Sequence, residues 1–392
     1  MKIYTLLFFC TAIAFFSSCK KDGVDVTHLY YENKDYELIS SKVNLPKEAL
    51  DYDIKFPNHA PFRGSTYNRD MATLGRVLFY DTNLSSDRSI SCASCHKQQI
   101  GFSDDVPFSK GVGSHHTNRN SLALGSVFNF QVYYGDPDFG LVPFFWDNRA
   151  FDSQSQASQT LKNNKEMGMN DDLIADRIRE QSFYEPLIEK AFNKELDEVT
   201  SDEVVQAISI FINSMGSFNS KFDQAYDEFL SHSNNDSDDI GTKEFALFTP
   251  IENQGKNIYV AHCGSCHGEQ HHTPDEIAAN NGLATSYSDN GVGKLTYNVS
   301  EMGFFKVPTL RNISLTAPYM HDGSISSLPE VIEHYSTGIV NHPNLSEALK
   351  DEDGNPRQFN FTQEEKEALL SFLNTLTDND FITAERYADP FK

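Results

Sequence analysis

Two Cys-x-x-Cys-His motifs constrain this chain more strongly than any other feature of its sequence. The first is Cys92-Ala-Ser-Cys95-His96 and the second is Cys263-Gly-Ser-Cys266-His267. Two thiols at this spacing can add to the two vinyl groups of one porphyrin, and the following His can ligate its iron, so the motif is the attachment signature of c-type haem. Zinc ribbons separate their cysteine pairs by ~15–20 residues, and these pairs lie much farther apart. A thioredoxin-like redox pair needs a βαβ context, which neither motif has. The sequence therefore predicts two covalently bound haems c, with His96 and His267 as iron ligands.

The N-terminal segment has the composition of an export signal. Lys2 precedes an apolar stretch over residues 3–16, which is too short to span a membrane, and two serines precede Cys19. Small residues before a Cys resemble a lipobox, in which the Cys becomes the lipidated first residue; the alternative is an ordinary signal peptide with an incidental Cys. Because Lys20 and Lys21 end the apolar run abruptly, we favour an exported, periplasmic protein whose membrane contact is a lipid anchor at Cys19.

Charge and length narrow the remaining possibilities. The formal net charge of -24 argues against nucleic acid, whose phosphates need a basic surface. It suits a protein that meets a basic or redox partner. A chain of 392 residues is long enough for two or three domains with separate cores.

The chain also carries an internal duplication. Gly75-Arg-Val-Leu-Phe79 precedes the first motif and Gly255-Lys-Asn-Ile-Tyr259 precedes the second, each on an expected helix. An amphipathic helix with a capping-box signature, Thr200-x-x-Glu203 or Thr362-x-x-Glu365, closes each half. This order predicts an all-α fold of two tandem cytochrome-c-like domains with a haem in each.

The expected organisation divides the chain into four segments. They are a signal peptide with lipobox (1–19), a tether without clear periodicity (20–45), an N-terminal cytochrome c domain (46–218) and a C-terminal cytochrome c domain (219–392), each of the two domains with one haem. Within this scheme, the acidic, Ser- and Asn-rich stretch 234–239 is expected to be a linker or an exposed loop.

Ordered motifs along residues 46–380 resemble the bacterial di-haem cytochrome c peroxidase family, and its MauG-type branch in particular. Besides the two haem motifs, they are Leu74-Gly-Arg-Val-Leu-Phe-Tyr-Asp81, Arg119-Asn120, Trp146-Asp-Asn-Arg-Ala150, Glu166-Met-Gly168, Val307-Pro-Thr-Leu-Arg-Asn312 and Thr316-Ala-Pro-Tyr-Met-His-Asp-Gly323. In this family one haem activates peroxide and the other stores or relays an electron.

The resemblance implies catalytic roles for three residues. Trp146, the single Trp of the chain, matches an indole between the haems that relays electrons; a core Trp is the alternative. Glu166 and Gln156 match a polar pair over the peroxide-binding face of the N-terminal haem, as acid/base and hydrogen-bonding orienter. A solvated loop is the alternative for this pair. Thr160 stands where the family pattern usually has Pro, which puts the rigidity of the pocket in question.

The same resemblance implies a calcium site between the domains. Asn120, Thr316 and Pro318 match its ligands, with a side-chain amide and main-chain carbonyls as the hard oxygen donors that calcium prefers. Ordinary turn chemistry is the alternative reading of these three residues.

The sixth iron ligands distinguish the branches of the family. Val112 stands where the typical N-terminal haem has a distal His, so an open or labile position is expected, although His115 and His116 lie close by in sequence. At the C-terminal haem, Tyr335 stands where Met is typical, as in the MauG-type branch. Alternatives are a core Tyr335, or ligation by Met302, Met320 or His334 in or near an expected helix over 329–336.

Three functions follow from these features. The first is reduction of hydrogen peroxide at the N-terminal haem, with electrons relayed through the C-terminal haem from a small cytochrome or quinol. The second is MauG-type oxidation of a partner protein's side chains through high-valent haems. The third is a di-haem electron carrier without catalysis, which requires both irons to be capped.

Overall fold

The structure is a computed structural model, and it describes residues 30–58, 67–127, 144–232, 240–269 and 276–392. The proposed signal peptide with Cys19 and the acidic stretch 234–239 lie outside the described residues. Helices dominate the described part, as the sequence predicts. Two short strands, β1 (Ala278–Ala279) and β2 (Phe305–Lys306), pair in antiparallel orientation. None of the described helices is long and apolar enough to cross a membrane.

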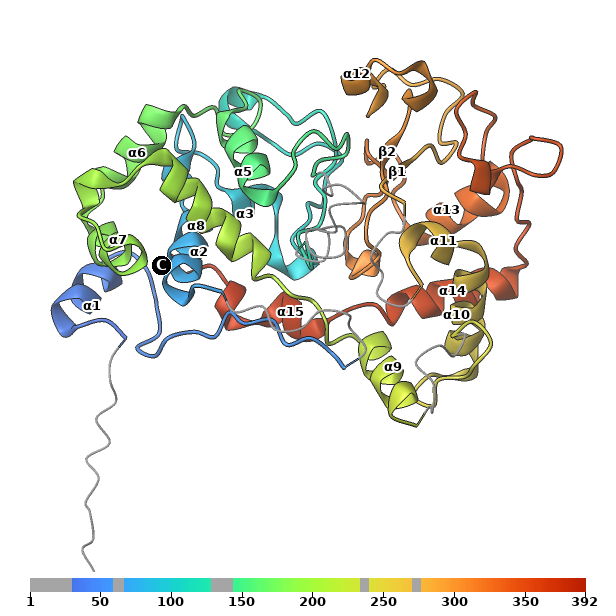
Figure 1. Ribbon diagram of the computed structural model, residues 1–392, viewed down its shortest axis with the longest axis horizontal. Helices are drawn as coiled ribbons and strands as arrows, with labels where there is room; N and C mark the ends of the chain where they lie inside the picture. The colour runs from blue at the N-terminus through green and yellow to red at the C-terminus, as the bar shows by residue number, and fades with distance from the viewer. Residues whose placement is uncertain (1–29, 59–66, 128–143, 233–239, 270–275) are drawn as a thin grey trace, which may run out of the picture.

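The two halves of the chain form the two ends of the molecule in Figure 1. The helices of the N-terminal half are α1 (Asn33–Ser40), α2 (Arg69–Tyr80), α3 (Cys92–Cys95), α5 (Ser153–Lys162), α6 (Asp171–Arg179), α7 (Glu185–Phe192) and α8 (Ser201–Asn213). Those of the C-terminal half are α9 (Lys221–His232), α10 (Pro250–His262), α11 (Gly264–His267), α12 (Gly293–Thr296), α13 (Leu328–Glu333), α14 (Gln363–Asn374) and α15 (Asn379–Thr383).

The long helices begin where their sequences supply N-terminal caps. The side chain of Thr200 caps α8 and that of Thr362 caps α14, each in a full capping box with a Glu three residues later. Thr249 caps α10 in the same way, with Pro250 at the first helical position. These local hydrogen bonds satisfy backbone N–H groups that no helical carbonyl can reach.

Each half is built around one close helix crossing, α2 against α8 and α10 against α14. A Cβ atom added to Gly75 would lie 2.0 Å from the Ala207 carbonyl oxygen, and one added to Gly255 would lie 1.9 Å from that of Ala368. Only glycine permits such an approach. The two crossings use the same contacts in the same order, so the duplication expected from the sequence is present in the packing.

The apolar residues form one large core in each half. The first includes side chains from Tyr31 to Met215, and the second includes side chains from Phe222 to Leu376. The last segment of the chain returns to the first core, where Phe381 and Tyr387 are buried. Figure 1 accordingly shows α15 away from the C-terminal half and the C-terminus beside α2 and α7.

The segment expected as a tether differs from that expectation over its described part. It contains α1, and Tyr31, Ile39 and Val43 are buried in the first core. The backbone N–H of Asn44 also donates to the carbonyl of Pro390, 2.6 Å away. Its apolar residues are too widely spaced to show a period, but they find partners from distant parts of the chain.

Gly255→Ala should lower the free energy of unfolding by about 1–3 kcal/mol, because the added methyl group forces α10 away from α14. At an unobstructed helical position the same change would stabilise by roughly 0.5–1 kcal/mol, so the sign is diagnostic. Denaturant unfolding measures the effect, with Gln254→Ala on the exposed face of α10 as control. Equal stability of the two variants would show that the close crossing is not required.

Candidate functional site

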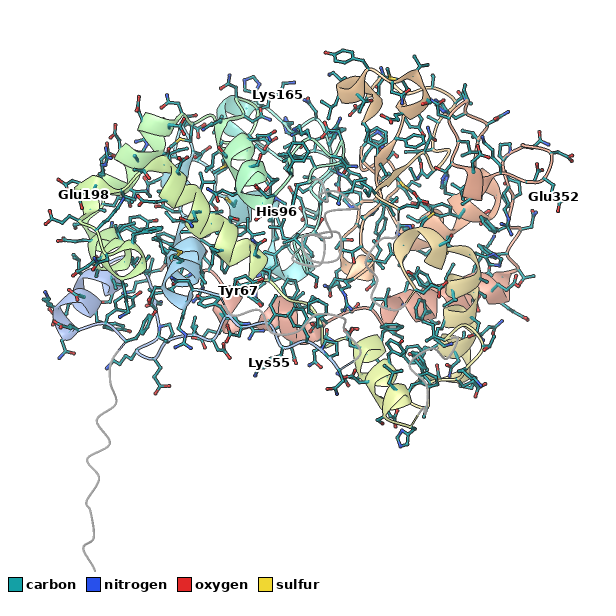
Figure 2. All side chains as sticks on the ribbon, viewed as in Figure 1. Lys55, Tyr67, His96, Lys165, Glu198 and Glu352 are labelled. Atoms are coloured by element: carbon teal, nitrogen blue, oxygen red, sulfur yellow. The ribbon has the colours of Figure 1, made fainter. Side chains whose placement is uncertain are left out.

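One continuous cavity of about 430 Å³ joins the two halves and is lined by both Cys-x-x-Cys-His motifs. Trp146, Gln156, Glu166 and Tyr335 line it as well. Figure 2 shows His96 inside the N-terminal half, whereas Lys165, which follows α5, lies at the outer edge. The fold thus brings the two motifs and the four functional candidates to a single space.

The first motif is held by the short helix α3, on which Cys92 and Cys95 share a face because they are three residues apart. His96 follows directly, and its Nδ1 is 2.9 Å from the carbonyl oxygen of Phe102. A carbonyl acceptor fixes the proton on Nδ1 and leaves Nε2 as the metal-binding nitrogen. Burial lowers the pKa of His96, which favours the neutral, ligating imidazole.

The second motif repeats this arrangement around α11. Nδ1 of His267 is 2.9 Å from the carbonyl oxygen of Pro308, and burial lowers the pKa of this imidazole too. The acceptor comes from Val307-Pro-Thr-Leu-Arg-Asn312, one of the segments that carried the family resemblance. Both imidazoles are therefore oriented as iron ligands by main-chain carbonyls.

The cysteines and the charges of the cavity also fit haem c. None of the four motif cysteines is in a disulfide, so all four are available for thioether bonds, and burial raises the pKa of Cys92 and Cys263 to about 12 and that of Cys95 to about 11. Haem carries two propionate carboxylates, and the described lining contains a single carboxylate, Glu166, against five cationic side chains: Lys110, Arg119, Arg149, Lys306 and Arg311. In a chain with 56 acidic and 32 basic residues, these five side chains give the cavity wall hydrogen-bond donors for an anionic cofactor, although Arg119, Arg149 and Arg311 are also paired with aspartates.

Trp146 lies in the loop between the two motifs. Its Nε1–H donates to the carbonyl oxygen of Asn120, 2.8 Å away, and its own carbonyl accepts from the backbone N–H of Lys306 on β2, 2.8 Å away. The indole is thus fixed from both halves of the molecule. Lys306 is buried, and burial lowers its pKa to about 7.

An ion-pair cluster that the sequence did not single out surrounds this loop. Arg119 pairs with Asp147 at 2.7 Å and makes a two-pronged contact with Asp289 of the C-terminal half, at 2.6 and 2.9 Å. Arg149 donates to Asp147 at 2.8 Å and lies over the ring of Phe145. Arg119 and Arg149 stand in motifs quoted for the resemblance, but Asp289 has no such signal because its partner is 170 residues away.

Glu166 and Gln156 both line the cavity. Gln156 lies on α5, and Glu166 lies on the turn that follows this helix. Asn163 donates from Nδ2 to Oε1 of Glu166 at 2.8 Å, and Gln156 donates from Nε2 to the hydroxyl of Thr160 at 3.1 Å. Burial raises the pKa of Glu166, while Arg149 and hydrogen bonds from Thr160 and Asn163 oppose the rise. A carboxylate in this setting is better placed for proton transfer than one in a solvated loop.

The three residues considered for the sixth iron position of the N-terminal haem, Val112, His115 and His116, differ in burial. Val112 is buried, and its N–H donates to the carbonyl of Glu166 at 3.0 Å. His115 and His116 are exposed, and neither is among the described residues that line the cavity.

Tyr335 lies in the π-helical turn His334–Gly338 (η8) that continues α13, where the sequence predicts a regular helix. Such turns are frequent at functional sites. Burial raises the pKa of Tyr335 to about 12, and the side chain of Asn281 opposes the rise. Asn281, which the sequence did not single out, also donates to the sulfur of Met320 at 3.3 Å.

The alternatives to Tyr335 differ in position. Met320 lines the cavity, whereas Met302 and His334 are not among its described lining residues. His334 Nε2 is 3.1 Å from the carbonyl oxygen of Asn281.

The three calcium candidates all line the same cavity. The N–H of Asn120 donates to the carbonyl of His321 at 2.9 Å, which ties the first half to the segment containing Thr316 and Pro318. No three His, Cys, Asp or Glu of the described chain gather as a metal site. A cation here would therefore depend on amide and carbonyl oxygens.

Two family models match the chain in tandem. Residues 69–229 match the family described as di-haem cytochrome c peroxidase, and residues 253–377 match cytochrome c. Each match includes one Cys-x-x-Cys-His motif and the glycine of one close helix crossing, Gly75 in the first match and Gly255 in the second.

Several curated proteins and solved structures are similar over most of their length. The methylamine utilization protein MauG of Methylorubrum extorquens is 30% identical over 339 residues, 84% of each chain. The cytochrome c551 peroxidase of Nitrosomonas europaea is 30% identical over 327 residues, 79% of this chain and 80% of that protein. The crystal structure of a MauG-like protein associated with microbial copper homeostasis superposes with a TM-score of 0.65 at 30% identity, covering 88% of this chain and 98% of the other.

A more distant structure agrees in fold. The diheme peroxidase BthA from Burkholderia thailandensis superposes with a TM-score of 0.63 at 18% identity, covering 83% of this chain and 91% of the other. With two haem attachment motifs, two carbonyl-oriented imidazoles and these relatives, the chain belongs to the di-haem cytochrome c peroxidase family that includes MauG, and it is a peroxidase-like oxidoreductase with two covalently bound haems c.

Proposed function

We propose that the protein reduces hydrogen peroxide at the N-terminal motif with electrons that arrive through the C-terminal motif. The balanced reaction consumes one hydrogen peroxide, two electrons and two protons and yields two waters. The observation that carries the proposal is the continuous cavity, which is lined by both motifs, by Trp146 and by Glu166 as its one described carboxylate. An unidentified redox partner, such as a small cytochrome or a quinol, supplies the electrons.

Glu166 is the proposed acid/base. When bound, the haem supplies the iron and the redox equivalents needed to cleave the O–O bond. The carboxylate of Glu166 accepts a proton from one oxygen of the peroxide and returns it to the other oxygen as that oxygen leaves as water. Since burial raises the pKa of Glu166, its pKa is brought closer to neutral pH, where both proton transfers are feasible.

Gln156 and Trp146 have the supporting roles. Gln156 uses its amide nitrogen on Thr160, which leaves its carbonyl oxygen to orient peroxide. Trp146 is the proposed electron relay, because an indole is easier to oxidise than the neighbouring phenyl rings of Phe144 and Phe145. Its anchoring from both halves supports a fixed distance between the two redox sites.

A second function, MauG-type oxidation of a partner protein, is favoured by Tyr335. This residue lines the cavity at the C-terminal motif, on an irregular turn that presents it outside normal helical geometry. A phenolate oxygen on the iron would be anionic and hard and would favour oxidised states, whereas a neutral thioether favours ferrous iron. With Tyr335 as ligand, the C-terminal site would be a poor electron store and the enzyme would be better suited to oxidising a substrate.

We further propose a calcium ion held by Asn120, Thr316 and Pro318, which would fix the halves at the cavity rim.

We infer that the protein is exported, because the chain carries two covalently bound haems and its N-terminal segment has the composition of an export signal. We propose a lipid anchor at Cys19 as the membrane contact. The domain limits 46–218 and 219–392 stay a prediction.

Replacing Cys92 and Cys95 together by Ala should remove one of the two haems and abolish peroxide reduction, because the N-terminal motif loses both thioether bonds. Haem content by the pyridine haemochrome method and peroxide turnover measure the two effects. The matched variant, Ala at Cys263 and Cys266, should also lose one haem but retain a peroxide-reactive N-terminal site. Wild-type turnover in the first variant would refute the assignment of that site.

Glu166→Gln should keep both haems and slow the reaction with peroxide by roughly 10²–10⁴-fold, the usual contribution of a positioned proton-transfer group. Stopped-flow spectroscopy at saturating peroxide measures the rate. Asp172→Asn, at an exposed carboxylate of α6, is the control and should react like the wild type. If Glu166→Gln did so as well, Glu166 would not be the acid/base.

Tyr335→Phe should open the sixth position of the C-terminal haem, and Tyr335→Met should raise its reduction potential, because a thioether favours ferrous iron. Electronic and EPR spectra and a redox titration report these changes. Tyr297→Phe, at a tyrosine that is 88% exposed, is the control. An unchanged spectrum and potential in both Tyr335 variants would exclude it as the ligand.

A further inference from the structure

The loop over residues 97–103, which follows the first motif, orients the ring of His96. Its ends are held together, because the N–H of Lys97 donates to the carbonyl of Ser103 at 2.8 Å and the N–H of Phe102 donates to the carbonyl of Lys97 at 2.9 Å. The carbonyl oxygen of Phe102 is 2.9 Å from Nδ1 of His96. A partner at Nδ1 sets the orientation of a ligating imidazole and raises its basicity. The bond that His96 makes to iron therefore depends on where this loop holds one carbonyl group.

Phe102 presents this carbonyl from an unfavourable backbone conformation. Its φ is 59°, in the left-handed region that bulky residues rarely adopt. Such a conformation persists only where the surrounding structure holds it. The side chain of Phe102 is fully buried, so its packing is available as the restraint. Without that restraint, rotation of φ toward ordinary values would move the carbonyl away from Nδ1 of His96.

The ring of Phe102 is packed by aromatic side chains from opposite ends of the chain. Its centroid is 6.0 Å from that of Phe79 on α2, 6.4 Å from that of Tyr387 and 5.4 Å from that of Phe381. Phe381, the closest of the three, lies on α15. Figure 1 shows α15 between α2 of the first half and α14 of the second. A residue from the last segment of the chain thus packs directly on the residue that orients His96.

Hydrogen bonds attach α15 both to the loop and to the C-terminal half. Nε2 of Gln98, within the loop, donates to the carbonyl of Ala384 at 3.0 Å and to that of Phe381 at 3.4 Å. At the start of the helix, the N–H of Asp378 donates to Oδ1 of Asn312 at 2.9 Å. The carboxylate of Asp378 in turn accepts from the N–H of Phe381 at 3.0 Å. These bonds fix where the Phe381 ring lies.

We propose that Phe381 is a positioning residue for His96. Its ring holds Phe102 in the left-handed conformation from which the Phe102 carbonyl accepts from Nδ1 of His96. The strength of the iron bond at the N-terminal haem is thereby set by a side chain of α15. The inference takes His96 as the iron ligand, and only its kinetic readout rests on the proposed function, in which peroxide reacts at this haem.

The same contacts make the orientation of His96 depend on the second half of the molecule. A Cβ atom added to Gly101 of the loop would lie 3.3 Å from Cβ of Asn312. Asn312 belongs to the segment whose Pro308 carbonyl orients His267. The two segments that orient the haem histidines therefore meet beside α15, and the restraint on His96 is complete only when both halves are in place.

The competing explanation is that Phe381 only fills the first core. It is buried there, and a smaller side chain would then lower stability and leave the iron bond of His96 unchanged. Phe391 offers a matched control in the same terminal segment. It packs against the same core, and its ring lies 6.4 Å from that of Phe183. Loss of its ring therefore tests general loosening of the segment.

The test compares Phe381→Leu with Phe391→Leu in the holoenzyme, with haem content checked by the pyridine haemochrome method. Resonance Raman spectroscopy of the ferrous protein measures the iron–histidine stretching band, assigned to the N-terminal haem by its loss when Cys92 and Cys95 are replaced by Ala. Phe381→Leu should lower this frequency and raise the reduction potential of the same haem, because an imidazole with a weaker partner at Nδ1 donates less to iron. The C-terminal haem should be unchanged, and Phe391→Leu should match the wild type.

Gln98→Met gives an independent test that leaves the ring of Phe381 in place. Without the donor to the two carbonyls of the α15 segment, the frequency and the potential should shift in the same directions by smaller amounts. Wild-type values in both Phe381→Leu and Gln98→Met, or an equal shift in Phe391→Leu, would overturn the proposal.

The kinetic readout separates this proposal from the proposed function. Phe381→Leu should react with peroxide roughly tenfold more slowly, the lower end of the loss typical for partners of metal-bound histidines. A shifted band and potential with a wild-type peroxide rate would support the positioning role of Phe381 and count against peroxide chemistry at the N-terminal haem.

Discussion

The rest of the structure depends on the close crossing of two helices in each half. At Gly75 and Gly255 the helix backbone approaches a carbonyl oxygen of its partner helix so closely that a Cβ atom would lie about 2 Å from it. The helix that crosses there precedes the haem motif: α10 leads directly into α11, and α2 is joined to α3 by residues 81–91. The crossing thus sets where each Cys pair begins, and the carbonyls that orient His96 and His267 complete the placement. Covalent haem attachment requires two thiols and one imidazole to converge, and a rigid helix crossing fixes where they do so.

Joining two such units creates a site that neither has alone. Arg119 reaches from the first half to Asp289 of the second and also holds Asp147, the residue after Trp146. The buried Arg311 pairs with Asp223 and donates to the carbonyl of Ser217 at the junction of the halves, 2.9 Å away. Because ion pairs with low exposure need good geometry to offset desolvation, these contacts favour one relative position of the halves. Electron transfer through Trp146, as proposed, would require such a fixed position.

The sequence predicts those features of this protein that depend on local chemistry. Haem attachment follows from residues within a five-residue motif, and the caps at Thr200 and Thr362 follow from residues three positions apart. Features formed by contacts between distant residues were missed. The burial of α1, the return of α15 to the first core and the pairing of Arg119 with Asp289 depend on partners that the fold alone brings together. The π-helical turn at Tyr335 was predicted as a regular helix, because hydrophobic spacing over 329–336 does not reveal one extra residue in a turn.

The distribution of charge indicates how the two haem sites divide their work. Acidic residues outnumber basic ones in the whole chain, 56 to 32, yet the described cavity lining has one carboxylate, and that carboxylate lies beside the first motif. Proton transfer is therefore available at the N-terminal site, where Glu166 is half-buried and balanced between burial and the charge of Arg149. Around the second motif, Asn281 interacts with Tyr335 and donates to the sulfur of Met320, and none of the described lining residues there is a carboxylate. A site without a carboxylate in its described lining can change its redox state without an obligatory proton transfer to such a group. In the proposed function, the placement of this one acid separates the chemistry of peroxide from the storage of redox equivalents.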